Sequence, residues 1–300
     1  MADQPASPVA EPTVDTASAA AEIAPVVPLQ HAAELTEAGS AVAENPLPID
    51  LGADWHVHTD LGRGSVSAVG MVDAAQAAGL HTVGISDQVS ATTDWLPDYV
   101  EMVRAFARPE IDVRCGVETA VLDRAGRLDL PDDVTGVDHV IVTAVVVPGA
   151  HGPVDLADAR AALERGSVTG AQIVDDLVAA MVAAVDTSPA YTILGRPFSL
   201  LPQLGLDDDL VTDDHLAALA TACREGSAAV EIDETWRAPS ARIALALADA
   251  GVTLVAGSDA TAPRGVGAWR YLGALTGHGP AQSADDDAAS GPETLVSAAS

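Results

Sequence analysis

Residues 53–87 read ADWHVHTDLGRGSVSAVGMVDAAQAAGLHTVGISD, and this stretch contains the pattern that decides the fold. The short runs Ala53–His58 and Thr82–Asp87 are typical of buried strands, and the Ala-rich segment Ser67–Ala78 between them is typical of a helix. A strand, a helix and a second strand in this order form a βαβ unit, in which the two strands run parallel. Polar residues stand at the end of each strand, where parallel α/β folds place their chemistry.

The same alternation continues along most of the chain. Further strands are predicted at Asp112–Glu118, His139–Thr143, Tyr191–Gly195, Ala228–Asp233 and Thr253–Asp259. Further helices are predicted at Leu156–Glu164, Thr169–Asp186, Thr212–Glu225 and Ser240–Ala250. Seven such units predict an α/β protein whose parallel strands form a barrel-like sheet. An open, doubly wound sheet fits the same pattern and stays an alternative at this point.

The two ends of the chain differ in composition from this middle part. Residues 1–47 are rich in Ala, Pro, Ser, Thr and Glu and contain no aromatic residue, and residues 278–300 have a similar polar composition. Such segments cannot bury enough apolar surface to fold alone. We therefore predict a single domain at residues 48–277, between a disordered acidic extension and a disordered tail.

The charge of the chain limits its partners. It has 44 acidic residues and 14 basic ones, all of them Arg, which gives a net charge of −30. This charge repels a phosphate backbone, so we expect no nucleic-acid partner. The two cysteines, Cys115 and Cys223, form no metal or redox motif and indicate reduced thiols. With neither a targeting signal nor a run that could span a bilayer, we expect a cytoplasmic protein without membrane contact.

The most specific chemical signal is the segment Asp54-Trp-His56-Val-His58-Thr59 at the end of the first predicted strand. Residues i and i+2 of a strand face the same side, so both imidazoles can reach one metal ion. Two structural histidines would give the same pattern. Similar polar segments end later strands, and these are Ser86-Asp87, Gly116-Val-Glu118 and Ser258-Asp259.

This ordered set resembles the motifs of the polymerase-and-histidinol-phosphatase (PHP) superfamily, over about residues 50–272. Asp54–Thr59 resembles the opening DxHxHT motif, and Ser86-Asp87-Gln88 resembles the second motif. Gly116–Glu118 matches the GxE motif, and Gly257–Thr261 resembles the closing one. The resemblance implies a distorted seven-stranded (β/α) barrel that hydrolyses phosphoesters with up to three metal ions.

By this resemblance, one metal site is complete. Its ligands would be His56, His58, Glu118 and Asp259, all of which are present. Two imidazoles and two carboxylates suit one divalent transition metal, which is Zn, Mn or Fe. Asp87 is expected to orient a ligand histidine and so to support the catalytic site.

Four histidines of the family pattern are replaced, by Gln88, Val145, Arg196 and Thr261. We therefore expect the second and third metal sites to be lost. Arg196 is the replacement with the clearest chemical consequence. Its guanidinium can bind a phosphate or carboxylate bidentately, or it can form an ion pair with Glu118 or Glu231.

The sequence thus predicts a single-metal phosphoesterase that acts on a small phosphorylated metabolite, with Arg196 and Asp87 assisting catalysis. The ion would polarise the phosphoryl oxygen, and Arg196 would stabilise charge in the transition state. A catalytically inactive PHP-fold protein with a binding or regulatory role is the alternative, because four ligand histidines are missing. Activity with added Mn²⁺ or Zn²⁺ distinguishes the two.

A first prediction concerns the ends of the chain. A protein trimmed to residues 47–277 should keep its melting temperature within a few degrees of that of the full chain, because the removed segments bury little. Differential scanning calorimetry of the two proteins checks this. A large fall in melting temperature would show that one of the ends packs on the barrel.

Overall fold

The computed structural model describes residues 46–278 with the exception of residue 107. Its main element is one sheet of seven parallel strands in the order β1 (Ala53–Val57), β2 (Thr82–Gln88), β3 (Asp112–Ala120), β4 (His139–Thr143), β7 (Tyr191–Gly195), β8 (Ala229–Asp233) and β9 (Thr253–Gly257). All seven predicted strands are present, each within two residues of its predicted limits.

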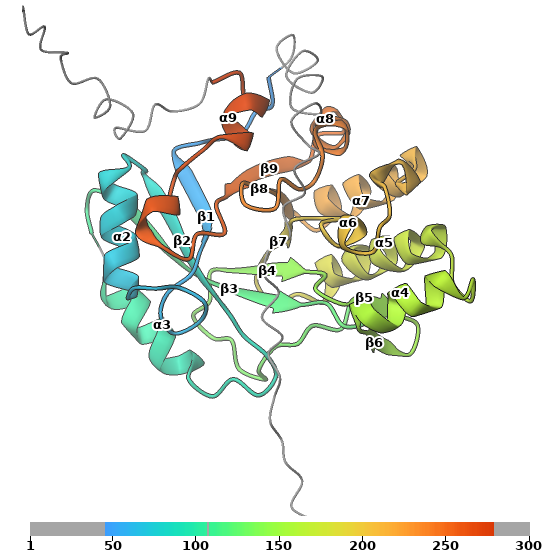
Figure 1. The fold of residues 1–300 in the computed structure, drawn as a ribbon. Helices are drawn as coiled ribbons and strands as arrows, with labels where there is room; N and C mark the ends of the chain where they lie inside the picture. Colours follow the sequence, from blue (N-terminus) through green and yellow to red (C-terminus); the bar gives the residue numbers. More distant parts are fainter. Residues whose placement is uncertain (1–45, 107, 279–300) are drawn as a thin grey trace, which may run out of the picture.

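The sheet curls until its first and last strands approach each other (Figure 1). At the carboxyl ends of these strands, Val57 of β1 forms a parallel bridge with Ala260. The N–H of His58 donates to the carbonyl oxygen of Ala260 at 2.9 Å. The protein is therefore a nearly closed, seven-stranded (β/α) barrel in a single α/β domain, as predicted. The alternative of an open, doubly wound sheet is wrong.

The predicted disordered ends, residues 1–47 and 278–300, lie outside the described residues, apart from Pro46, Leu47 and His278. Leu47 is buried, and its N–H donates to the carbonyl oxygen of Leu275 at 3.1 Å. The folded part of the chain therefore includes Leu47.

Helices cover the outside of the barrel (Figure 1). They are α2 (Ala68–Ala77), α3 (Leu96–Ala105), α4 (Leu156–Glu164), α5 (Gly170–Thr187), α6 (Leu200–Gln203), α7 (Asp213–Glu225), α8 (Ala241–Asp249) and α9 (Tyr271–Leu275). The five predicted helices are among them, whereas α3, α6 and α9 were not predicted. An antiparallel hairpin of β5 (Val147–Gly149) and β6 (Gly152–Val154) was not predicted either.

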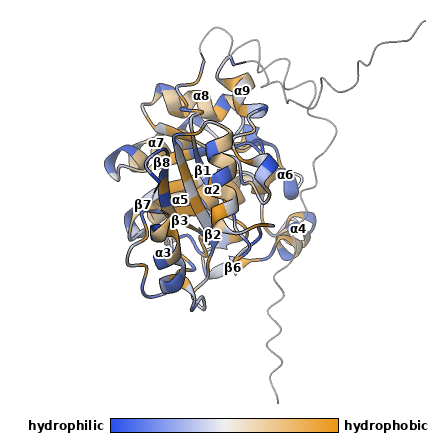
Figure 2. Cartoon of the chain, turned by 90° about the vertical axis from the view of Figure 1, so that its left-hand side faces the viewer, coloured by the Kyte–Doolittle hydropathy of each residue, from blue (hydrophilic) through white to orange (hydrophobic). Residues whose placement is uncertain are grey.

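Helix α5 illustrates how the sequence forms the outer layer. A capping box starts it, since Thr169 Oγ1 accepts from the N–H of Gln172 and the Gln172 side chain accepts from the N–H of Thr169. Its buried positions recur at helical spacing and include Ile173, Leu177 and Met181. Figure 2 shows hydrophobic colour on the inner faces and hydrophilic colour on outer turns. Within the described part of the chain, no helix is long and apolar enough to cross a membrane.

The inside of the barrel is layered. An apolar layer consists of Trp55, Ile141, Ile193, Ala229 and Val255. Side chains two residues further along a strand point to the same side, one step closer to its carboxyl end. At these next positions the strands carry Thr143, Gly195, Glu231 and Gly257. An apolar floor therefore lies directly beneath a polar layer.

His139 belongs to the floor of the barrel. It starts β4, has 1% of its surface exposed, and its ring lies edge-on to Trp55 with the ring centroids 5.3 Å apart. Its Nε2 lies 2.9 Å from Ser86 Oγ. Gly116 leaves the space for this ring, because a Cβ at that position would overlap His139. Burial lowers the pKa of His139 to about 4.

This burial predicts a pH dependence of stability. In the unfolded chain a histidine has a pKa of about 6.5. The contribution of neutral His139 to the free energy of unfolding is therefore fully present above that pH, and it is lost as the pH falls toward 4. The free energy of unfolding should fall by about 3 kcal/mol over this range. Urea unfolding of the wild type and His139→Gln between pH 7 and pH 4 measures it. The variant should be less stable at pH 7 but should show a flatter pH dependence. Parallel curves would contradict the prediction.

Candidate active site

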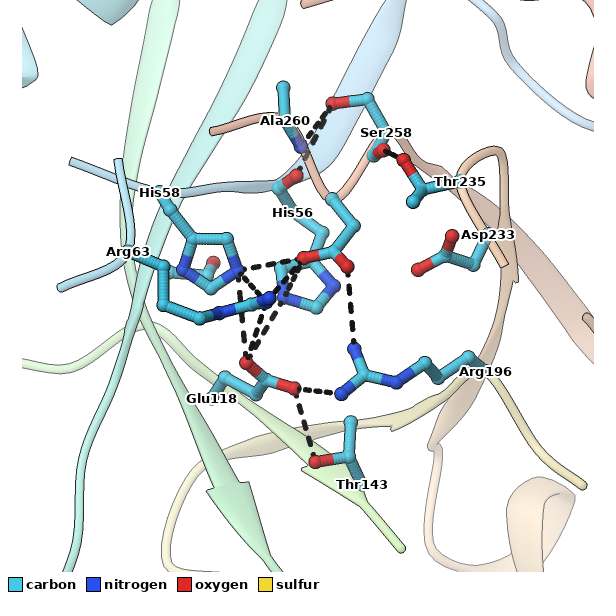
Figure 3. Close-up of polar contacts among 12 residues, drawn as sticks. His56, His58, Arg63, Glu118, Thr143, Arg196, Asp233, Thr235, Ser258 and Ala260 are labelled. Atoms are coloured by element: carbon cyan, nitrogen blue, oxygen red, sulfur yellow. Dashed lines mark hydrogen bonds and ion pairs between the residues drawn. The ribbon is translucent and has the colours of Figure 1, made fainter. Parts of the chain in front are cut away.

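Buried charged side chains fill the barrel at the carboxyl ends of the strands (Figure 3). His56 comes from β1, Glu118 from β3, and His58 and Asp259 from the residues that directly follow β1 and β9. The structure thus brings together all four residues predicted as metal ligands. The two histidines and Glu118 have no exposed surface, and Asp259 is 5% exposed.

The donor atoms of His56, His58 and Glu118 lie close enough together to hold one metal ion, and Asp259 adjoins the two histidines. Glu118 Oε2 lies 3.7 Å from Nε2 of both His56 and His58. Asp259 Oδ1 lies 3.7 Å from His56 Nε2 and 2.8 Å from His58 Nε2. Ligands bound tetrahedrally to zinc at about 2.1 Å are about 3.4 Å apart. His56 Nε2 and Glu118 Oε2 have no hydrogen-bond partner in the described part of the chain, so the donor set fits a divalent ion.

Glu231 orients one of the two histidines. Its Oε1 lies 2.7 Å from His56 Nδ1, so Nδ1 donates to the carboxylate and Nε2 faces the centre of the cluster. The other oxygen of Glu231 accepts from the backbone N–H of Arg196 at 3.0 Å. Gly257 permits this arrangement, because a Cβ there would overlap Glu231 Oε1. The carboxylate–histidine arrangement is common around bound metal ions.

Electrostatics keep the cluster ionised although it is buried. Burial lowers the pKa of His56, but Glu231, Glu118 and Asp259 outweigh it and raise that pKa well above the usual value. Burial alone would raise the pKa of Glu118, yet Arg196 and the two histidines lower it. A metal ion would therefore meet a ready carboxylate, but it would have to displace a proton from His56.

Arg63 places a guanidinium nitrogen inside the cluster. Its Nη2 lies 2.6 Å from Asp259 Oδ1, 2.8 Å from His58 Nε2 and 3.5 Å from Glu118 Oε2. This position, among three of the four donors, is where an ion bound to them would lie. The Arg63 side chain is 39% exposed and belongs to the segment between β1 and α2. An ion and this side chain therefore exclude each other, and Arg63 has room to leave.

Arg196 follows β7 and forms the second cationic contact. Its Nη2 lies 2.8 Å from Glu118 Oε1, so the ion pair considered from the sequence is present. Its Cζ lies 5.0 Å from the centre of the Trp236 ring, which holds the guanidinium from another side. Only 6% of its side chain is exposed. Its Nη1 lies 3.8 Å from Asp259 Oδ2 but forms no hydrogen bond with a described residue, so it can still donate one to a ligand.

Asp87 lies at the edge of the cluster. Its carboxylate accepts from the N–H of Thr59 at 2.7 Å and from the Thr59 hydroxyl at 2.5 Å. Its Oδ1 is 3.8 Å from His58 Nδ1, which is too long for a hydrogen bond. Asp87 thus fixes the turn that follows β1, and its predicted role as a direct orienter of His58 stays a prediction.

The side chains of the other replaced positions form no hydrogen bond or ion pair with the four donor residues in the described part of the chain. Gln88 and Thr261 are exposed, and Val145 is partly buried. A second group of possible ligands consists of His56, Glu231 and Asp233. Sequence reasoning did not find Arg63, Trp236 or the role of Glu231. The only available signal for Arg63 was its place shortly after the two histidines.

Comparisons with known proteins support the fold. No protein-family profile matches the sequence, and no curated protein matches it significantly. The structure is similar to hisK, a candidate histidinol phosphatase from Listeria monocytogenes, with a TM-score of 0.57 and 11% identity over 72% of this chain and 97% of that one. It is also similar to the histidinol phosphate phosphatase of Lactococcus lactis subsp. lactis, with a TM-score of 0.52 and 15% identity over 70% and 86% of the two chains. At these identities the likeness shows a shared fold.

The position of Arg63 predicts an effect on metal affinity. Arg63→Ala should bind Zn²⁺ or Mn²⁺ at least about tenfold more tightly than the wild type, because a competing cation is removed from the donors. Competition with a chromophoric chelator measures the affinity. Arg264→Ala removes a nearby positive charge that does not contact the donors, and it should change the affinity much less. Equal or weaker binding by Arg63→Ala would contradict this.

Proposed function

We propose that this chain is a metal-dependent hydrolase of the PHP type that acts on a small phosphoester with one divalent ion. The ion would be held by His56, His58, Glu118 and Asp259. The observation that carries the proposal is the convergence of these residues at the carboxyl end of a (β/α) barrel, where each histidine Nε2 lies 2.8–3.7 Å from an oxygen of Glu118 and of Asp259. The two unpartnered buried atoms, His56 Nε2 and Glu118 Oε2, also support it.

The proteins with similar structures support the same proposal. The Lactococcus lactis histidinol phosphate phosphatase was solved with zinc, L-histidinol and phosphate. A barrel of this kind can therefore hold a metal ion and a phosphate together. For this chain we propose a small phosphorylated metabolite as the substrate and Zn, Mn or Fe as the metal, since the donor set alone does not distinguish them.

The residues around the donors have separate tasks in this proposal. A divalent ion, when bound, supplies a Lewis acid at the phosphoryl group. Arg196 donates from Nη1, which forms no hydrogen bond with a described residue, to a phosphoryl oxygen and stabilises the charge that develops there. Glu118 and the Trp236 ring hold that guanidinium in place. Glu231 holds His56, and Asp87 fixes the turn that carries His58.

Metal analysis together with a panel of phosphoesters tests this function. The purified protein should bind at most about one transition metal ion per chain, and hydrolysis should depend on added Zn²⁺ or Mn²⁺. His58→Ala should lose both the ion and the activity, whereas the exposed His81→Ala should keep both. A protein that binds the ion and hydrolyses no phosphoester would instead fit the inactive binding protein.

A fifth prediction concerns Arg196. Arg196→Ala should lower kcat on the best phosphoester by about a hundredfold, as the loss of one donor to a developing oxyanion does. Arg196→Lys should recover only part of the rate, because an ammonium group cannot reproduce the planar fork. Metal content is measured in parallel, since Glu118 loses a partner in both variants. Unchanged kcat with full metal content would limit Arg196 to a structural ion pair.

A further inference from the structure

A pocket of about 300 Å³ opens beside the four donors. It is lined mainly by residues that follow β8 and β9, including Trp236, Thr261 and Arg264. Arg63 and Asp259 belong both to the donor cluster and to the pocket. A molecule whose phosphoryl group lies at the donors can therefore place its remaining atoms in this space.

The two carboxylates that line the pocket are already engaged. Glu234 accepts from the backbone N–H groups of Arg270, Tyr271 and Leu272 at 2.9–3.0 Å. Asp259 accepts from the Trp236 indole at 2.8 Å through Oδ2, and its Oδ1 contacts Arg63. Little acceptor capacity is left in the pocket for a cationic group of a ligand.

Arg264 is a charged side chain of the pocket that has no partner among the described residues. It lies in the short 3₁₀ turn Pro263–Gly265 after β9, and it is exposed. Its side chain forms no hydrogen bond or ion pair with any residue in the described range 46–278, residue 107 set aside. A guanidinium has five N–H donors in a planar fork, which matches a carboxylate or phosphate. The pocket therefore offers a ligand an unpaired positive charge, the guanidinium of Arg264.

Arginines gather at this end of the barrel although the chain is acidic. The net charge is −30, with 14 basic residues. Five of the arginines lie on segments that follow β1, β7, β8 or β9, namely Arg63, Arg196, Arg237, Arg264 and Arg270. At an ionic strength of about 0.15 M, charges more than about 8 Å away are largely screened. The carboxylates at this end, among them Glu118, Glu234 and Asp259, are paired or hydrogen-bonded within the protein, so a ligand in the pocket meets Arg264 rather than the net charge of the chain.

We propose that the ligand of this site is a small phosphoester with a second anionic group, a carboxylate or a further phosphate, which Arg264 binds. This inference rests on the proposed function, because it places the phosphoryl group of the ligand at the four donors. Arg264 is thereby a specificity-determining residue. It selects a substrate with two anionic ends over one with a neutral or cationic end.

A matched series of non-hydrolysable phosphonates tests this proposal. Propylphosphonate has a neutral end, 3-phosphonopropionate a carboxylate, propane-1,3-diphosphonate a second phosphonate and 3-aminopropylphosphonate an ammonium group. Their dissociation constants are measured by calorimetry on the metal-saturated full chain at about 0.15 M salt, for the wild type, Arg264→Ala and Arg165→Ala. Arg165 is an exposed arginine whose side chain has no partner among the described residues, at the end of α4, so it controls for loss of charge alone.

The two probes with a second anionic group are 3-phosphonopropionate and propane-1,3-diphosphonate. The wild type should bind at least one of them about tenfold or more tightly than propylphosphonate, since a charge-assisted hydrogen bond contributes on that scale. The tighter of the two identifies the second group as carboxylate or phosphate. Arg264→Ala should abolish the difference, and Arg165→Ala should keep it. Equal binding of all probes, tightest binding of the ammonium probe, or no binding at all would overturn the proposal. So would a uniform loss of affinity in Arg264→Ala.

The outcome is separable from that of the proposed hydrolase. Metal-dependent hydrolysis without any preference among the probe ends would remove the role of Arg264 and leave the hydrolase. A preference that depends on Arg264, in a protein that hydrolyses no phosphoester, would leave a binding site for dianionic ligands and remove the hydrolase.

Discussion

Glu118 is an ionised carboxylate without exposed surface, and the arrangement of the barrel mouth follows from keeping it charged there. Moving a carboxylate out of water costs several kcal/mol unless cations and hydrogen bonds compensate it. The compensation comes from Arg196 at 2.8 Å, the Thr143 hydroxyl at 3.1 Å and the imidazoles of His56 and His58 at 3.7 Å. These partners come from strands β1 and β4 and from the segments after β1 and β7, so one charge ties much of the barrel together.

The same charge explains why the centre of the cluster holds a cation. Arg63 Nη2 contacts Asp259, His58 and Glu118 in the way that a divalent ion would. A guanidinium spreads one positive charge over a plane, whereas a metal ion concentrates two at a point. Either cation would balance the charge of the site, and only the proposed metal ion would supply a Lewis acid. Exchange between the two is easiest for the side chain that is partly exposed, which is Arg63 rather than Arg196.

Much of the fold and part of the site could be predicted from the sequence, for identifiable reasons. Buried parallel strands give short runs of bulky residues, and the helices between them have clear periodicity, so all seven strands were found. The hairpin β5–β6 was missed because Val147–Val154 contains prolines and glycines that look like a loop. Helix α3 was missed because Pro97 in its first turn is a residue that more often marks a loop.

Some residues of the site could likewise be predicted from the sequence, and others could not. His56 and His58 are close in sequence, and the motif resemblance supplied Glu118 and Asp259. Arg63, by contrast, reaches the cluster through a turn whose shape depends on the Thr59–Asp87 hydrogen bonds, and no local pattern signals that path. Contacts made by side chains across loops depend on tertiary structure, and therefore Arg63 and Trp236 emerged only from the structure, whereas Arg196 was predicted from the motif position that it occupies.

The bridge between Val57 and Ala260 joins the first strand to the last, and the residues that it brings together are far apart in the chain. His58 and Asp259 are separated by 201 positions. Contacts of such long range form late in folding, because a long loop must close before they contribute. The donor cluster therefore does not exist in any partly folded chain that lacks β9. In the proposed enzyme, a newly made chain would complete its metal site only after the last strand has docked, so metal occupancy would report that the barrel has closed.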